Sequence, residues 1–396
     1  MNILYIHQYF KTPKEPGGTR SYWIAKELLK KGHSVTMLTT SSQIEEKVKK
    51  QNIDGIDVIY LKVPYNQKMS IITRLKSFFS FMIKSTSVAL KVKNVDLVIA
   101  TSTPLTIGFP ALVLKFFKKI PYLFEVRDLW PEVPIQMGGL NNKFLQKLAI
   151  GFEKIIYKKA LHIIALSPGM EKGVLKFVSQ KKVSMIPNMA KIDAFFPREK
   201  NFKLLESLNL KKELFKVIHF GALGLANGAH TIINTAKLLK DNNEIEFIFI
   251  GGGATEADLI KECESNNLTN VKFLGRFAMS ETAEIVNFCD VSIVSFLDLP
   301  ILYTNSPNKL FDSLSAGKPI LVNSAGWTKD LVEKYNCGLY ANPKHPQELA
   351  DKIIFLKNNI KEREIMSQNS RNLAETKYDK SILCAQFADI VAGLKL

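Results

Sequence analysis

The chain has 396 residues with 46% hydrophobic content, which is enough apolar material for two buried cores and argues against intrinsic disorder. Its four cysteines form no CxxC pair and no cluster with histidine, which excludes a zinc site and a disulfide framework and predicts reduced core thiols. The net charge of +17 lies in residues 1–198, which hold 31 Lys and Arg against 13 Asp and Glu, and this asymmetry indicates an anionic partner.

Neither a secretory leader nor a membrane-spanning helix is predicted. The first ten residues lack a basic start, a long apolar centre and a small-residue cleavage site, so we expect a cytoplasmic protein. The longest stretch without charge, residues 97–114, is interrupted by prolines, a glycine and hydroxyl side chains. It therefore indicates a strand, a turn and a helix start.

Short apolar runs alternate with helical patterns through residues 1–190. The runs are NILYIH, SVTMLT, DVIYL, DLVIA, YLFEV, HIIAL and VSMIPN. Strands of this kind are typical of a parallel sheet covered on both faces, so we predict a Rossmann-like α/β domain. After the first strand, Gly17 and Gly18 precede a helix that starts near Thr19. They either let the backbone approach a phosphate at the helix N-terminus or form a flexible turn.

Residues 70–93 combine apolar positions at helical spacing with basic side chains. Phe78 and Phe79 lie beside Lys76 and Lys84 in this segment, and such a helix suits the interface of an anionic membrane. An ordinary surface helix whose apolar face packs on the sheet explains the same pattern. No nucleic-acid partner is expected, because no RRM, KH, zinc-finger or helix-turn-helix signature occurs.

A second alternating series predicts a second Rossmann-like domain over residues 215–379. Its apolar runs are KVIHFG, EFIFIGGG, VKFLG, DVSIVSF and PILVN. The polar stretch 189–214 is interpreted as the connection between the two domains. Two such domains, facing each other across a cleft, bring the carboxyl ends of both sheets to one site. The last residues, 380–396, form an amphipathic helix that we expect to pack back on the N-terminal domain.

Two glycine-rich turns follow strands of this second domain. Gly221, Gly224 and Gly228 suit a diphosphate cradle, but the GxGxxG spacing of a nicotinamide site is absent, which disfavours a dehydrogenase. The three glycines at 251–253 are interpreted as a sharp strand-to-helix turn.

The segment 303–326 is the most informative part of the sequence. Asn305, Ser306, Asn308 and Lys309 lie at the start of its helix. The backbone amides of this helix start and the Lys309 side chain can hold phosphates. Asp312 lies one turn into the helix, where a carboxylate accepts both hydroxyl protons of a ribose diol.

The run PNKLFDSLSAGKPI resembles the donor-site segment of the family 4 glycosyltransferases. The GG loop, the segment EVRDLWPE at 125–132 and the final helix occur in the order of that family. The resemblance implies a GT-B fold and a retaining transfer that needs no metal or other cofactor. It also implies a UDP-sugar donor and a lipid-linked saccharide acceptor, with the enzyme peripheral on the inner face of the plasma membrane.

A narrower likeness rests on the combination IHQYF, GGTRSY, RDLWPE and PNKLFD. It is similar to enzymes that add amino-deoxyhexoses of the L-fucosamine type during O-antigen or capsule assembly. The expected sugar is therefore an N-acetylated amino-deoxyhexose.

The chain departs from the family pattern at three places. Thr304 stands where the first of two paired glutamates is usual, which changes the expected contact with the sugar. Arg127 precedes Asp128 where a His-Asp pair is common, and loss of that His fits a donor without a 6-hydroxyl. Leu223 and Asn227 replace the usual Arg and Lys of the diphosphate clamp, which leaves Lys309 and Arg276 to supply positive charge.

The resemblance implies that preorganised electrostatics do most of the catalytic work. The backbone amides of Gly18 and of the 305–309 loop, with Lys309, would hold the departing diphosphate. Asp128 would orient the acceptor hydroxyl, or alternatively cap the turn at Trp130, and Arg127 would bind a phosphate. Phe277 either neighbours the nucleotide base or anchors its loop.

Two other functions fit parts of the sequence. A UDP-sugar 2-epimerase shares the two-domain scaffold and needs no lipid acceptor. A non-enzymatic polyanion-binding protein explains the basic half, but it leaves the PNKLFD segment without a role.

Overall fold

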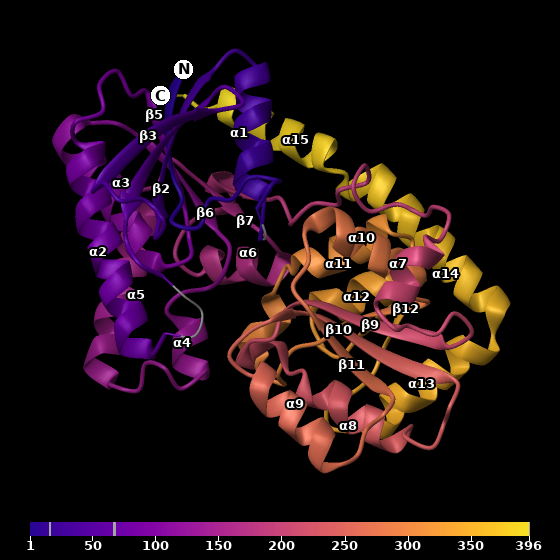
Figure 1. Ribbon diagram of the computed structural model, residues 1–396. Helices are drawn as coiled ribbons and strands as arrows, with labels where there is room; N and C mark the ends of the chain where they lie inside the picture. The colour runs from indigo at the N-terminus through magenta and orange to yellow at the C-terminus, as the bar shows by residue number, and fades with distance from the viewer. Residues whose placement is uncertain (16, 66–68, 396) are drawn as a thin grey trace. The chain divides into compact units, whose positions relative to one another are not determined.

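The computed structural model describes residues 1–15, 17–65 and 69–395, and their contacts divide the chain into two units (Figure 1). The first unit comprises most of residues 1–187 and the chain from Ser381 onward, and the second comprises Asn188–Lys380. Each unit is a β-sheet with helices between its strands. The predicted class, two Rossmann-like α/β domains, is confirmed.

The first unit contains an eight-stranded sheet with the order β3-β4-β2-β1-β5-β6-β7-β8. All neighbouring strands are parallel except β3 and β4. The strands are β1 (Asn2–Ile6), β2 (Ser34–Ser41), β3 (Val48–Ile53), β4 (Ile56–Lys62), β5 (Leu97–Thr101), β6 (Tyr122–Val126), β7 (His162–Ala165) and β8 (Val183–Met185).

The sequence did not predict β3, because almost all of its side chains are exposed and it offers no apolar run. It pairs antiparallel with β4 through a tight turn at Asp54 and Gly55, both of which have positive φ. An Asp-Gly pair between two strands is a strong hairpin signal. The dipeptide Asp54-Gly55 could therefore have indicated this hairpin from the sequence.

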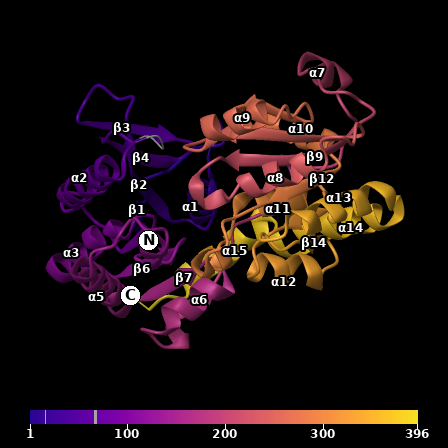
Figure 2. The ribbon, with the colours of Figure 1, turned by 90° about the horizontal axis from the view of Figure 1, so that it is seen from below.

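The described residues of the first unit also form seven α-helices: α1 (Arg20–Lys30), α2 (Ile71–Ala89), α3 (Gly108–Lys118), α4 (Glu132–Gln136), α5 (Lys143–Lys159), α6 (Pro168–Leu175) and α15 (Lys380–Ala392). Helices α2, α3 and α5 lie side by side, with α3 in contact with both of the others (Figures 1 and 2). Helix α15 buries Leu383, Phe387 and Val391, and Asp389 on it pairs with Lys31, 3.0 Å away. The final helix therefore packs on the first unit, as predicted.

The second unit contains a six-stranded parallel sheet with the order β11-β10-β9-β12-β13-β14. Its strands are β9 (Phe215–Ala222), β10 (Ile245–Gly252), β11 (Val271–Gly275), β12 (Val291–Val294), β13 (Ile320–Val322) and β14 (Gly338–Tyr340). Its helices are α7 (Phe202–Ser207), α8 (His230–Leu238), α9 (Glu256–Ser265), α10 (Met279–Phe288), α11 (Asn308–Ser315), α12 (Trp327–Lys334), α13 (Pro346–Asn358) and α14 (Ile360–Leu373).

Two hydrophobic clusters cover the two faces of this second sheet. Val217 and Phe247 belong to one cluster, whereas their chain neighbours Ile218 and Ile248 belong to the other. Successive strand residues point to opposite faces, so both faces of β9 and β10 are buried. This explains why these strands read as continuous apolar runs.

Both sheets place a topological switch at a central strand. In the first unit β1 lies between β2 and β5, and in the second β9 lies between β10 and β12. Ligands of open α/β sheets bind at the carboxyl ends of strands on the two sides of such a switch. The loops after Ile6 and Ala222 therefore mark the functional edge of each unit.

Two sequence interpretations need correction. Residues 189–214 are not a bare connection, because Phe195, Leu205 and Leu210 enter a core cluster of the second unit. Phe78 does not face a membrane, because it is buried beside the rings of Tyr65 and Trp130. Phe78 lies on the inward face of α2, whereas Phe79, Lys76 and Lys84 are exposed.

The four cysteines are buried and none of them forms a disulfide bond with another described cysteine, as predicted. Within the described ranges, no helix has both the length and the apolar composition required to span a bilayer.

Candidate functional site

In the first unit, the carboxyl ends of β1 and β6 bring a histidine against an arginine. An Arg127 Nη1–H donates to His7 Nε2, 3.1 Å away, and His7 Nδ1 lies 2.7 Å from Ser21 Oγ on α1. Because a guanidinium only donates, Nε2 is the acceptor and the ring proton resides on Nδ1. Burial and the charge of Arg127 lower the pKa of His7 well below its ordinary value. A neutral His7 therefore holds the guanidinium in place.

Asp128 lies next to Arg127 and is tied to the loop after β5. Thr103 Oγ1 donates to Asp128 Oδ2 at 2.7 Å, and the Arg127 backbone N–H donates to Ser102 Oγ at 3.0 Å. Desolvation raises the pKa of Asp128, although Thr103 and Arg127 act in the opposite direction. A carboxylate of raised pKa is a better proton acceptor, which suits the predicted contact with a hydroxyl.

The GG loop is fastened by Arg20, the first residue of α1, which lies two positions after Gly18. Arg20 Nε–H donates to Glu125 Oε1 at 2.8 Å, and its terminal nitrogens donate to the carbonyl oxygens of Ile186 and Pro187. Gly17 is exposed with φ of 136°, a backbone region that other residues rarely adopt. The loop is therefore held at its base by Arg20, while the predicted phosphate contact of Gly18 stays a prediction.

Gln8 is a further polar residue at this edge. It follows β1 directly and is fully buried, and its backbone carbonyl accepts hydrogen bonds from Thr39 and Thr40. Neither its side-chain oxygen nor its nitrogen has a hydrogen-bond partner among the residues that the structure describes. Such unsatisfied buried amides are rare in folded proteins.

In the second unit, the turns after β9 and β10 pack against each other. A Cβ on Gly251 would lie 1.8 Å from the carbonyl oxygen of Gly221, so only glycine allows this approach. This supports the structural interpretation of the glycines at 251–253. A Cβ on Gly221 would lie 3.6 Å from Lys309 Cε, which places the first turn beside the predicted phosphate-binding lysine.

Lys309 is a buried cation surrounded by neutral groups. Its Nζ lies 3.1 Å from His219 Nε2 and 3.3 Å from Asn227 Oδ1. Burial lowers the pKa of Lys309 to about 7, and burial together with this neighbouring charge lowers the pKa of His219 well below its ordinary value. No carboxylate within 4 Å of Lys309 Nζ is found in the described part of the chain. A cation in this position gains free energy when an anion arrives.

Asp312 has an ion-pair partner that the sequence did not predict. Its Oδ1 accepts a hydrogen bond from Lys191 Nζ, and both side chains are almost completely buried. Burial raises the pKa of Asp312, and the charge and hydrogen bond of Lys191 lower it. A ribose contact through Asp312 would therefore include Lys191 as well.

The remaining predicted residues of this segment lie at or near the start of α11. Thr304 ends the short helix η4 (Pro300–Thr304), where its hydroxyl donates to the Ile301 carbonyl. Ser306 is buried and binds both the backbone and the side chain of Asn188. Asn305 and Asn308 are partly exposed, and α11 begins at Asn308. The two asparagine side chains have no hydrogen-bond partner among the residues that the structure describes, so they are placed to meet a ligand.

The predicted residues outside this segment differ in exposure. Arg276 is exposed, and its guanidinium lies close to Gly252 and Glu256. Phe277 packs against a core cluster of the second unit, which fits an anchor of its loop. Gly224 precedes a short turn, and Asn227 at the end of that turn contacts Lys309.

Sequence reasoning missed five residues that hold the predicted groups in place: His7, Ser21, Thr103, Lys191 and His219. His7 directly follows β1, and His219 lies three residues before the end of β9. A histidine near the carboxyl end of the first strand of each unit was a feature that the sequence could have shown. Lys191 gave no local signal, because its partner lies 121 positions away.

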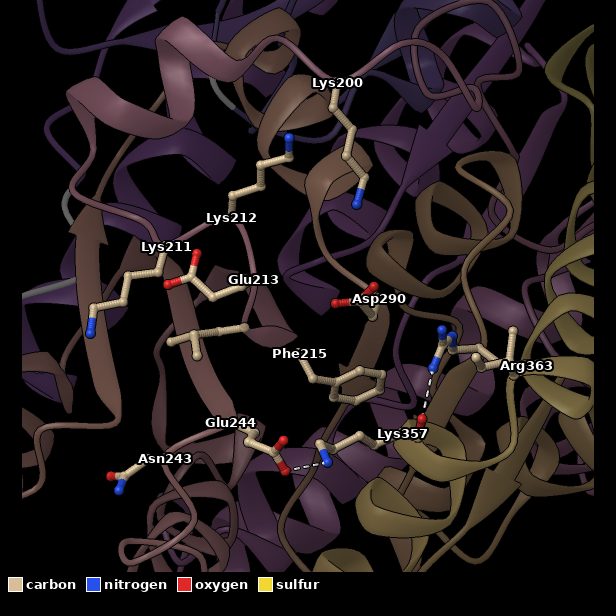
Figure 3. Close-up of a pocket in the computed structure, with 12 residues that line it drawn as sticks. Lys200, Lys211, Lys212, Glu213, Phe215, Asn243, Glu244, Asp290, Lys357 and Arg363 are labelled. Atoms are coloured by element: carbon tan, nitrogen blue, oxygen red, sulfur yellow. Dashed lines mark hydrogen bonds and ion pairs between the residues drawn. The ribbon is translucent and has the colours of Figure 1, made fainter.

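A separate cavity of about 580 Å³ lies at the opposite edge of the second sheet (Figure 3). Phe215 at the start of β9 and Asp290 before β12 line it. Lys357 points to Glu244, with 2.6 Å between Nζ and Oε2. Lysines also line this cavity, but none of the predicted site residues does.

Groups of three or more His, Cys, Asp or Glu side chains able to hold a metal ion are absent from residues 1–15, 17–65 and 69–395. Independence from metals stays a prediction.

Comparison with protein families identifies both parts of the chain. Residues 17–189 match the family model described as "Glycosyl transferase 4-like domain", and residues 200–373 match the one described as "Glycosyl transferases group 1".

One curated relative is the N,N'-diacetylbacillosaminyl-diphospho-undecaprenol alpha-1,3-N-acetylgalactosaminyltransferase of Campylobacter jejuni. It is 24% identical over 278 residues, which cover 68% of this chain and 70% of the relative.

Solved structures of similar fold cover nearly the whole chain. The sucrose-phosphate synthase of Thermosynechococcus elongatus has a TM-score of 0.79 and 17% identity, covering 99% of this chain and 98% of that one. HepE of Anabaena, in complex with UDP-glucose, has a TM-score of 0.72 and 19% identity, and all of both chains is covered.

Proposed function

This chain is a glycosyltransferase of the GT-B fold, composed of a glycosyl transferase 4-like domain and a group 1 domain, and we propose that it transfers a sugar from a UDP-sugar to a lipid-linked saccharide. The main support for a UDP-sugar donor is Lys309, a buried cation whose hydrogen-bond partners are neutral. The complex of the similar HepE with UDP-glucose supports a uridine nucleotide. The diphospho-undecaprenol in the name of the Campylobacter relative supports a lipid-linked acceptor.

In the proposed donor site, the diphosphate lies against the turn at Gly221 and the start of α11. Lys309 Nζ would donate to a phosphate oxygen, and the first amides of α11 would add partial positive charge. Asn227 already contacts Lys309 and is placed to bind the same diphosphate. The Asp312–Lys191 pair would meet the ribose.

In the proposed acceptor site, Arg127 binds a phosphate of the lipid diphosphate while Asp128 orients the acceptor sugar through a hydroxyl beside the attacking one, whose own proton goes to the departing phosphate. His7 keeps the guanidinium fixed, so less side-chain entropy is lost on binding.

The proposed reaction retains the configuration at the anomeric carbon. The bond from that carbon to the phosphate oxygen breaks, and the acceptor oxygen forms a new bond on the same face. The hydroxyl proton passes to the departing phosphate, so charge is balanced. Lys309 and the amides at 305–309 stabilise the negative charge that develops on the leaving diphosphate.

The sugar, pathway and location are proposed on the resemblance stated for the sequence. An N-acetylated amino-deoxyhexose suits the Arg127 position, where the His that often meets a 6-hydroxyl is missing. We place the enzyme in O-antigen or capsule synthesis, at the cytoplasmic face of the membrane that carries the lipid acceptor.

The test is a thermal-shift panel of UDP, GDP, their sugars and NAD, without added metal. Ligand at a hundredfold excess over its dissociation constant stabilises a protein by about 2.7 kcal/mol, and we expect this for uridine nucleotides. A folded protein that none of these nucleotides stabilises would contradict the donor site.

Product analysis then separates transfer from epimerisation. With UDP-sugar alone we expect slow or no turnover, and with a lipid-linked saccharide we expect a longer glycolipid and free UDP. Interconversion of UDP-sugars without acceptor would instead identify an epimerase.

A further inference from the structure

The outer side of α2, α3 and α5 is unusually apolar for a surface. Twelve of the twenty exposed large apolar side chains in the described part of the chain lie on these three helices. They are Ile72, Leu75, Phe79, Ile83, Phe109, Phe116, Phe117, Phe144, Leu145, Leu148, Ile150 and Ile155. Single exposed apolar residues are ordinary, but a concentrated group marks an interaction surface.

The three helices form one continuous layer. Lys118 at the end of α3 donates to the carbonyl oxygen of Leu90 just after α2. Gly108 of α3 packs against Ile156 of α5, and Lys159 Nζ lies 5.8 Å from the centre of the Phe116 ring. Both views show the helices adjacent to one another (Figures 1 and 2). We name their exposed side chains the three-helix face.

The first half of α5 has the least cover. Phe144 is 68% exposed, Leu148 is 56% exposed and Leu145 is 49% exposed. A solvent-facing helix ordinarily buries one apolar stripe and shows polar side chains elsewhere. None of the residues 143–152 is buried and their apolar side chains project outward, so this half of the helix lacks the partner that its composition requires.

The charge on the three-helix face has one sign. The segments 71–89, 108–118 and 143–159 hold ten Lys and Arg and a single acid. That acid, Glu153, is 6% exposed and its burial raises its pKa to about 7. The lysines at the surface of α5, Lys147, Lys154 and Lys158 among them, are exposed between the apolar side chains.

We propose that the three-helix face docks on an anionic lipid bilayer. Exposed phenylalanines would enter the interface between headgroups and chains, and the lysines would meet lipid phosphates. A second copy of this chain fits less well, because it would oppose like charges across the contact. The docking does not require the proposed reaction, although a lipid-linked acceptor would benefit from it.

The experiment measures binding to sedimented vesicles without donor or acceptor. Vesicles of phosphatidylcholine with phosphatidylglycerol should bind the wild type more tightly than phosphatidylcholine alone, and added salt should weaken this binding. An apolar variant should lose roughly tenfold or more of the partition coefficient even at low salt. Its substitutions are Phe116→Ser, Phe117→Ser, Phe144→Ser and Leu148→Ser.

A charge variant separates the electrostatic part. Each lysine near an anionic leaflet raises the partition coefficient about fivefold. Reversing the charge of three lysines should therefore remove most of the salt-sensitive binding. Its substitutions are Lys147→Glu, Lys154→Glu and Lys158→Glu.

Matched variants of the second unit control for lost apolar area and lost net charge. The apolar control carries Leu238→Ser, Phe355→Ser, Ile360→Ser and Ile365→Ser at comparably exposed positions. The charge control carries Lys240→Glu, Lys261→Glu and Lys361→Glu. Both controls should bind vesicles as the wild type does.

Three outcomes would overturn the proposal. They are a wild type that does not sediment with vesicles, face variants that bind as the wild type does, and controls that lose as much binding as the face variants. A concentration-dependent dimer that the apolar variant abolishes, without vesicle binding, would assign the face to a second copy. Donor affinity measured in solution fails or holds independently, so the two proposals are tested separately.

Discussion

A buried cation lies near the base of a functional loop in each unit, and the two have different surroundings. Arg20 in the first unit meets the carboxylate of Glu125 and two backbone carbonyls, so its charge is paired and each of its three nitrogens donates a hydrogen bond internally. Lys309 in the second unit meets a neutral histidine and an amide. A compensated cation holds structure together, whereas an uncompensated one costs free energy until an anion binds.

The largest expected effect tests Arg20, the cation whose charge is paired with a carboxylate. Glu125→Gln keeps the shape of the side chain but leaves Arg20 as a buried, unpaired charge. Breaking one partner of a buried pair typically costs about 3–5 kcal/mol, so the free energy of unfolding should fall by that amount. Denaturant unfolding monitored by circular dichroism measures it.

The control for Glu125→Gln is the exposed pair between Lys31 and Asp389 in the same unit. Asp389→Asn should cost less than about 1 kcal/mol. Equal losses in the two variants would mean that Arg20 and Glu125 are no more important than a surface pair.

The next largest effect tests Lys309, the cation that meets only neutral groups. Lys309→Met removes the buried charge, so the affinity for a UDP-sugar should fall by about 1.5–3 kcal/mol, the scale of a charged hydrogen bond. Stability should not fall, because a desolvated cation is removed. Calorimetric titration with the UDP-sugar and thermal unfolding of the free protein measure the two quantities.

Lys318→Met is the matched control, because Lys318 is a partly exposed lysine of this unit whose pKa desolvation also lowers, to about 8. It precedes β13 and donates to the Asn287 carbonyl, away from the predicted site residues. Loss of donor affinity in this variant, with Lys309→Met unaffected, would remove Lys309 from the site.

A smaller effect appears as a pH dependence of donor affinity. The pKa of Lys309 is lowered to about 7 in the free protein, and a bound diphosphate should raise it. The complex then holds more protons than the free protein, so affinity should fall as pH rises above about 7, by up to about 1.4 kcal/mol per unit. Titration between roughly pH 7 and 9 with a UDP-sugar, whose diphosphate diester does not titrate there, measures this slope.

The free energy of unfolding should change with pH in the opposite direction to the donor affinity. The folded pKa of Lys309 lies below its unfolded value of 10.5, so the unfolded chain binds more protons between these values and stability rises with pH there. Lys309→Met should flatten both dependences. A wild-type affinity that is constant over this range would show that Lys309 stays charged without a ligand.

The sequence was sufficient for the parts of the fold that local patterns encode. Runs such as EFIFIGGG and the helical spacing in residues 380–394 identified strands and the returning helix, because each burial pattern is visible within a few residues. The exposed strand β3 was missed for the same reason, since it buries nothing.

The sites were predictable only as far as their residues lie close in sequence. The helix that begins at Asn308 was predictable because a helix start is a local feature, and its contact with a phosphate stays a prediction. The pairs Arg127 with His7 and Asp312 with Lys191 join residues about 120 positions apart, and a single sequence contains no information about such contacts. The direction of Phe78 was missed because α2 is apolar on both sides, so spacing alone could not select the buried one.

The smallest effect concerns a residue that acts through another. His7→Ala removes the acceptor that fixes Arg127, at a cost of about 0.5–1.5 kcal/mol for one hydrogen bond. Because Arg127 is proposed to meet the lipid phosphate, the loss should raise KM for the acceptor and leave KM for the donor unchanged. His7→Gln should restore most of it, since its amide can donate to Ser21 and accept from Arg127. The matched control is His162→Ala, which breaks a similar contact to Ser184 at 2.9 Å within the sheet. Equal changes in both KM values, or no rescue by glutamine, would indicate that His7 supports the fold and does not position Arg127.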